Sequence, residues 1–118
     1  MNKYNSNLKY TEWLKQFRGG DDTNVPICRD ALEDIKFIIK LCREYNVPQP
    51  TIRPWSGGDG VQVEWNRNGW YIEIESSSKG IGVYLENEAD DTEYIECSLK
   101  DIYGAFLLVR EFLRRPKS

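Results

Sequence analysis

The sequence has no histidine, and this absence removes several chemistries at once. Imidazole is the usual proton carrier near neutral pH, the commonest transition-metal ligand, and the base of Ser-His and Cys-His nucleophile pairs. An enzyme made from this chain would need carboxylates, Lys, Tyr or Cys instead. We therefore expect a protein that is not an enzyme and that uses neither a cofactor nor a metal.

Cysteine and long apolar runs are also scarce. Cys28, Cys42 and Cys97 are odd in number and widely separated, so they fit neither a disulfide framework nor a zinc site of the C-x-x-C kind. The chain lacks a run of about eighteen apolar residues, and its first residues, MNKYNSNLKY, lack the apolar stretch of a secretion signal. We expect a cytoplasmic protein with free thiols and no membrane partner.

What the chain does contain is apolar residues at helical spacing, in three segments. Its 118 residues are 40% hydrophobic, which suits a single domain, residues 1–118, with one core. The predicted helices are a short one at LKYTEWLKQF, a long one over ICRDALEDIKFIIKLCREYN, and a third after Ser98, where Ser98 and Asp101 resemble a capping box. The intervening segment VPQPTIRPWSGGDG predicts an extended approach to a sheet, with Ile52 pointing inward.

The stretch VQVEWNRNGWYIEIE predicts a β-hairpin. Asn-Gly between alternating apolar runs is the strongest short-range hairpin signal, because both central turn residues need positive φ. With Asn68-Gly69 as a two-residue loop, apolar side chains fall on one side of the hairpin and carboxylates on the other. The predicted partners are Val63 with Ile74, Glu64 with Glu73, and Trp65 with Ile72.

Two further strands are predicted at GIGVYLE and TEYIECS. A five-residue loop, Asn87–Asp91, would align Val83 with Ile95 and Tyr84 with Tyr94, and would turn Ile95 inward. The sequence therefore predicts an α+β fold: a four-stranded antiparallel meander sheet with two long helices packed on one face and a short N-terminal helix.

Negative charge is concentrated on the predicted sheet. The chain has a net charge of −3, yet residues 60–98 hold two basic and nine acidic side chains. The alternation along the strands places several of these acids around tyrosines on the uncovered face of the sheet. The candidate partner-binding residues on that face are Glu64, Tyr71, Glu73, Glu75, Tyr84, Tyr94 and Glu96.

Glu64 opposite Glu73 needs an explanation, because like charges directly opposite on a sheet destabilise it by a few tenths to about 1 kcal/mol. Water could screen the repulsion, a divalent ion could neutralise it, or the face could dock a basic partner, with Tyr supplying contact area. Direct nucleic-acid binding is disfavoured, because phosphate contact needs clustered Lys and Arg and the pI is about 5.0. An acidic sheet could instead mimic phosphates.

The segment PQPTIRPWSGGDGVQVEW, followed by WYIEIE, resembles a recurring pattern in small bacterial and phage proteins of uncharacterised function. In that pattern a helix leads into P-x-I-x-P, a Gly-containing turn, an acidic or polar residue before Trp, and a strand of alternating acids. The resemblance covers residues 30–86 and implies a bacterial or mobile-element origin. It brings no catalytic residues with it.

These observations favour a non-enzymatic protein-binding module that docks a basic protein partner on an acidic, Tyr-bearing sheet face. Its expected role is that of an inhibitor or immunity-like factor in bacterial or phage conflict. One alternative is a divalent-metal-dependent enzyme that uses Glu64, Glu73 and Glu75. The other is a structural homodimer formed through an edge strand or the sheet face.

Overall fold

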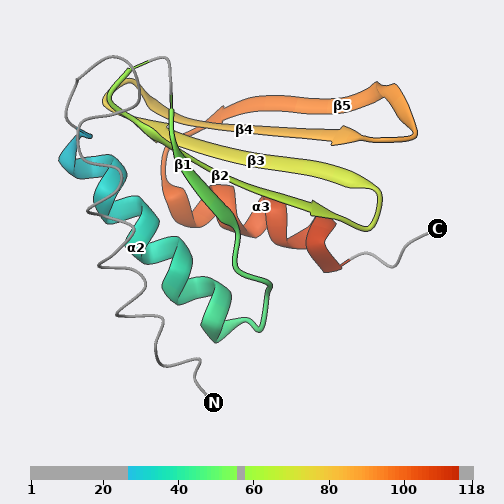
Figure 1. Cartoon of the computed structure of the whole chain (residues 1–118), viewed down its shortest axis with the longest axis horizontal. Coiled ribbons are helices and arrows are strands. Elements are labelled where there is room, and N and C mark those ends of the chain that lie inside the picture. The colour runs from blue at the N-terminus through green and yellow to red at the C-terminus, as the bar shows by residue number, and fades with distance from the viewer. Residues whose placement is uncertain (1–26, 56–57, 115–118) are drawn as a thin grey trace.

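The described part of the chain forms one antiparallel sheet with two helices on one of its faces (Figure 1). The computed structural model describes residues 27–55 and 58–114, and the short helix predicted at LKYTEWLKQF lies outside them. The described elements are α2 (Arg29–Glu44), β1 (Thr51–Pro54), β2 (Val61–Arg67), β3 (Trp70–Ser77), β4 (Gly80–Asn87), β5 (Asp90–Leu99) and α3 (Ile102–Arg114).

The sheet has five strands in the order β1-β2-β3-β4-β5, so the predicted four-stranded sheet is wrong. The additional strand is β1, which pairs with β2 from Thr51 opposite Glu64 to Pro54 opposite Val61. The sequence predicted only an extended approach to the sheet for this segment. Pro54 cannot donate a hydrogen bond to a neighbouring strand. An edge strand has a neighbour on one side only, so this edge position tolerates Pro54.

The β2–β3 hairpin has the predicted register. Its turn residues adopt the left-handed conformation that the two-residue loop requires, with φ of 54° at Asn68 and 83° at Gly69. The predicted pairs Val63–Ile74, Glu64–Glu73 and Trp65–Ile72 are confirmed.

The β4–β5 hairpin differs from its predicted register by two residues. The predicted pairs, Val83 with Ile95 and Tyr84 with Tyr94, are wrong. Tyr84 instead faces Glu96, because β5 contains a bulge. Asn87 pairs with Asp90, but the preceding Glu86 pairs with Tyr94, so residues 91–93 are extra residues of β5 at this point. A shift of two residues leaves every side chain on its predicted face of the sheet.

Helix α3 begins later than a capping box at Ser98 would place it. β5 continues through Leu99, and the helix starts at Ile102. Asp101 Oδ1 accepts a hydrogen bond from the backbone N–H of Gly104 at 2.8 Å, so Asp101 is itself the capping residue. Within the described residues, neither helix is long and apolar enough to cross a membrane.

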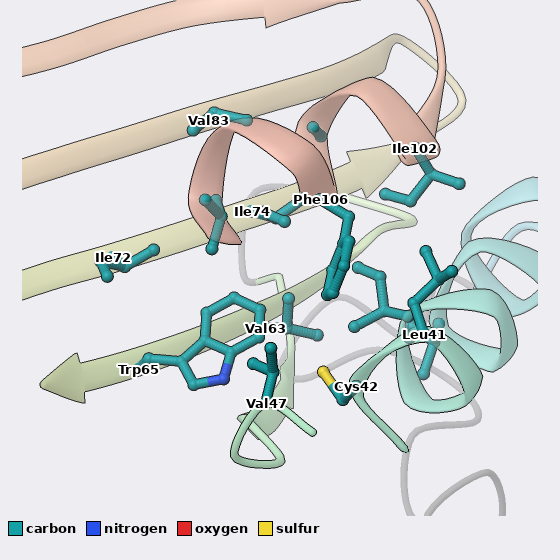
Figure 2. Close-up of a cluster of buried hydrophobic side chains, with 14 of the residues drawn as sticks. Leu41, Cys42, Val47, Val63, Trp65, Ile72, Ile74, Val83, Ile102 and Phe106 are labelled. Carbon is teal, nitrogen blue, oxygen red and sulfur yellow. The ribbon is translucent and has the colours of Figure 1, made fainter. Parts of the chain in front are cut away.

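The hydrophobic core lies between the helices and the face of the sheet that they cover. α2 packs over β2 and β3, and α3 packs over β3, β4 and β5. Figure 2 shows Phe106 pointing from α3 towards Val63 of the sheet and Leu41 of α2. Trp65 is buried and donates its indole N–H to the carbonyl oxygen of Pro48 at 2.7 Å.

Ile95 is the exception on the covered side of the sheet. It was expected to point inward, but 38% of its surface is exposed. The reason is its position on the outermost strand, near a β4–β5 turn that extends past the helical layer (Figure 1).

Candidate functional site

We call the sheet face opposite α2 and α3 the open face (Figure 1). It consists of alternate side chains along the strands, as in β2, where buried residues alternate with half-buried ones. All seven predicted partner-binding residues lie on it. Its residues include Thr51, Arg53, Gln62, Glu64, Asn66, Tyr71, Glu73, Glu75, Gly82, Tyr84, Glu86, Tyr94, Glu96 and Ser98.

Two neighbouring rows of paired residues cross the centre of the open face. The first row is Glu64, Glu73, Tyr84 and Glu96, and the second is Tyr71, Glu86 and Tyr94. The ring of Tyr84 has its centroid 6.3 Å from that of Tyr71 and 6.2 Å from that of Tyr94, which are distances of favourable aromatic pairs. The three tyrosines therefore form a continuous aromatic strip bordered by carboxylates.

The hydroxyl of Tyr71 lies between the two opposing carboxylates of Glu64 and Glu73. It donates a hydrogen bond to Glu73 Oε1 at 2.7 Å and lies 3.3 Å from Glu64 Oε2. Burial raises the pKa of Tyr71 above its usual value, and the hydrogen bond to Glu73 raises it further. The phenol therefore keeps its proton at neutral pH and offsets part of the repulsion between the two acids.

Glu64 has two further donors. Arg53 Nη2 donates to its Oε1 at 3.0 Å, and Gln62 Nε2 donates to its Oε2 at 2.9 Å. Sequence reasoning missed Arg53 because the strand that positions it, β1, was not predicted. Hydrogen-bond donors of the protein itself thus offset the repulsion between Glu64 and Glu73. This explanation differs from the three that the sequence suggested, which were screening by water, a divalent ion and a basic partner.

The same arrangement recurs one strand further on. Tyr84 donates its hydroxyl proton to Glu86 Oε1 at 2.6 Å, and this hydrogen bond raises the pKa of Tyr84 to about 12. Each of these tyrosines therefore holds the carboxylate two residues later on its own strand. Such charge-assisted bonds orient both side chains and leave the remaining carboxylate oxygen atoms available as acceptors.

Gly82 leaves a hollow in the open face, between Glu75 on β3 and Ser98 on β5. The hollow has a volume of about 480 Å³, and Glu73 and Glu96 also line it. Burial raises the pKa of Glu75, and the negative charge of Glu73 raises it further. Carboxylates around a concave surface favour a cationic group, such as a guanidinium or an ammonium.

The described residues contain no group of three or more Cys, Asp or Glu side chains arranged to hold a metal ion. The predicted metal alternative relied on Glu64, Glu73 and Glu75. In the structure Glu64 and Glu73 lie on either side of the Tyr71 hydroxyl, and Glu64 also accepts hydrogen bonds from Arg53 and Gln62.

The sequence contains a repeat that corresponds to this arrangement of tyrosines and carboxylates. The tripeptide Tyr-Ile-Glu or Tyr-Leu-Glu occurs at residues 71–73, 84–86 and 94–96, once in each of β3, β4 and β5. Because strand residues two apart share a face, each copy places a Tyr beside a Glu on the open face. The repeat would have indicated the pairing of phenols with carboxylates.

The comparisons with known proteins add no relative. No protein-family model, curated protein or solved structure matches this chain. The resemblance of residues 30–86 to small bacterial and phage proteins therefore stays a prediction.

Proposed function

We propose that this protein is a non-enzymatic binding module that docks a basic protein partner on its open face. The observation that carries the proposal is the row of tyrosines and carboxylates on the open face. Hydrogen bonds of 2.6 to 2.7 Å hold these side chains in place, between Tyr71 and Glu73 and between Tyr84 and Glu86. Side chains that are already fixed lose less conformational entropy when a partner binds.

The charge of the open face favours a cationic partner. Its carboxylates belong to Glu64, Glu73, Glu75, Glu86 and Glu96. Among the described residues of this face, Arg53 is the one cationic side chain, and it pairs with Glu64 at 3.0 Å. The remaining excess of negative charge would speed encounter with a basic surface and would disfavour acidic competitors.

The tyrosines supply the contact area that charge alone lacks. Tyr94 is 55% exposed and lies at the outer end of the aromatic strip. Tyr is enriched at the centres of protein interfaces, because its ring is rigid and amphipathic. Its ring can also lie against an Arg guanidinium, which adds a cation–π contribution. The role we propose is inhibition of the bound partner, as an immunity-like factor acts.

The test is charge reversal on the open face. The double variant Glu73→Lys and Glu75→Lys should lose capture of a basic protein from a lysate of the source organism, identified by mass spectrometry. A matched control is Glu44→Lys with Glu111→Lys, which changes the net charge equally at exposed positions on α2 and α3. The control variant should still capture the basic protein. Added salt should weaken capture by the wild type, because salt screens the charges of the open face.

The affinity of the purified candidate partner for the wild type and for each variant then tests whether the open face is the docking surface. Equal affinity of the wild type and the Glu73→Lys, Glu75→Lys variant, with both folded by circular dichroism, would reject the open face as the docking surface. Loss of binding in the control variant alone would place the interface on the helical layer.

A further inference from the structure

The two edges of the sheet differ in how well they are protected. β1 has four residues and ends in Pro54, which limits its ability to accept another strand. β5 has ten residues without a proline, and within the described residues its neighbour in the sheet is β4 alone. The outer side of β5 therefore presents a row of backbone N–H and C=O groups that a further strand could pair with.

Exposed apolar side chains lie at the middle of this open edge. Four large hydrophobic side chains of the described residues are exposed, and two of them are Tyr94 at 55% and Ile95 at 38%. Because they are consecutive, Tyr94 projects on the open face and Ile95 on the helix-covered side. A strand added at β5 would bury apolar surface on both sides of the sheet.

We propose that β5 pairs in antiparallel fashion with β5 of a second copy of this chain, with Ile95 on the two-fold axis. The two sheets then join into one continuous sheet. In this register Ile95 faces Ile95 of the second copy, and Tyr94 faces Glu96.

Charge selects this register. β5 is acidic, and self-pairing of an acidic strand is unfavourable wherever two carboxylates are directly opposite. In the proposed register Glu96, the one acidic residue of the regular part of β5 (residues 94–99), faces Tyr94 instead of another carboxylate. A shift of two residues in one direction would place Glu96 against Glu96. A shift in the other direction would set Tyr94 against Tyr94 and move Glu96 away from Tyr94.

In this register the rows of Tyr and Glu side chains on the open face also continue from one copy into the other. The row Glu73, Tyr84, Glu96 of one copy would meet Tyr94, Glu86, Tyr71 of the other. Tyr and Glu then alternate over six strands, as they do from β3 to β5 within one copy. The second copy thus repeats at β5 the pairing of Tyr84 with Glu96 that β4 already makes.

The mass of the protein in solution tests the pairing, together with two variants of matched exposure. The wild type should have twice the 13.8 kDa of one chain at micromolar concentrations and above. Ile95→Lys should halve that mass, because it would place two ammonium groups against each other on the axis. Leu107→Lys is the control, since Leu107 is 36% exposed but lies on α3, and it should leave the mass unchanged.

A wild type of 13.8 kDa at every concentration would overturn the proposal. So would a dimer that Ile95→Lys leaves intact, or one that only Leu107→Lys breaks. The result is independent of the basic partner, because the pairing uses the edge of the sheet and needs no other protein.

Cross-linking tests the register itself. In a Cys97→Ser background, a cysteine at position 95 should form a disulfide-linked dimer under mild oxidation. Directly opposite strand residues have Cα atoms about 4.5 to 5.5 Å apart, which is within disulfide range. Tyr94→Cys and Glu96→Cys are the controls, because each would be displaced by two residues from its own copy. Efficient cross-linking at either control position, and not at 95, would reject the register.

Discussion

The two faces of the sheet are stabilised in different ways, although both belong to the same strands. On the covered face the strand residues Val61, Val63, Trp65, Ile72, Ile74, Val83 and Leu85 are at most 4% exposed. On the open face the side chains are half-buried or exposed and are joined through Tyr–carboxylate hydrogen bonds. Burial of apolar area stabilises the first face, whereas the second is organised by hydrogen bonds from phenols to carboxylates.

Strand β3 allows the comparison at three consecutive positions. Ile74 is apolar and buried, Glu75 is acidic on the open face, and Ser76 is polar and buried. Because neighbouring strand residues point to opposite faces, the backbone environment is nearly the same for all three. Differences in the free energy of unfolding among variants at these three positions therefore reflect how each face of the sheet is stabilised.

The largest effect is expected at Ile74. Ile74→Ala would remove apolar contacts and leave a cavity in the core, because the side chain is 1% exposed. The free energy of unfolding should fall by about 2 to 5 kcal/mol, measured by urea denaturation. A loss below about 1 kcal/mol would mean that the core repacks and that the covered face is less tightly specified than its burial indicates.

A smaller loss is expected at Ser76, the buried polar residue of the covered face. Its Oγ donates a hydrogen bond to Asp34 Oδ2 on α2 at 2.6 Å. Burial raises the pKa of Asp34, and this hydrogen bond opposes the rise. Ser76→Ala should therefore cost about 1 to 3 kcal/mol of unfolding free energy at neutral pH.

The matched control for Ser76→Ala is the same substitution in an Asp34→Asn background, where no carboxylate needs the donor. The cost there should be smaller. Because the pKa of Asp34 is raised in the folded state, its ionisation disfavours folding, and the loss from Ser76→Ala should shrink as the pH falls and Asp34 takes up a proton. An equal cost in both backgrounds would show that packing, rather than the hydrogen bond, is what Ser76 supplies.

The smallest effect, and the opposite sign, is expected at Glu75. Burial and the charge of Glu73 raise the pKa of Glu75, so its stabilising contribution is present at low pH and is lost as the pH rises through the folded-state pKa. Glu75→Gln should therefore stabilise the fold at pH 7 by roughly 0.5 kcal/mol. The gain should vanish at acidic pH, where the wild-type side chain is protonated.

Glu88→Gln is the control for this effect, because Glu88 is exposed beside the β4–β5 turn. It should change the unfolding free energy little at either pH. A Glu75→Gln variant that is less stable than the wild type at pH 7 would show that Glu75 makes favourable contacts in its ionised form.

Part of the fold was predictable from local residues alone. The register of β2 and β3 was correct, because Asn68-Gly69 requires positive φ and so dictates the loop length. The β4–β5 register was wrong, because a two-residue shift leaves the apolar alternation unchanged and only turn geometry can decide it. β1 was predicted only as an extended segment, because its pairing with β2 depends on where the rest of the fold places it.

The candidate site was predictable to a similar extent. Alternation along the strands was enough to place seven polar residues on one face. It could not show that the Tyr71 hydroxyl lies between Glu64 and Glu73, or that Arg53 reaches Glu64 from β1. Those contacts depend on rotamers and on a neighbouring strand distant in sequence.

The sequence by itself determined which side chains point into the core and which point to solvent, because a strand has a period of two residues and one turn set the phase for β2 and β3. Only the tertiary structure decided which carboxylate meets which phenol, and which of the described strands form the two edges of the sheet. Both depend on strand order and register, and these are settled by the packing of helices and strands across the whole chain rather than by any short segment.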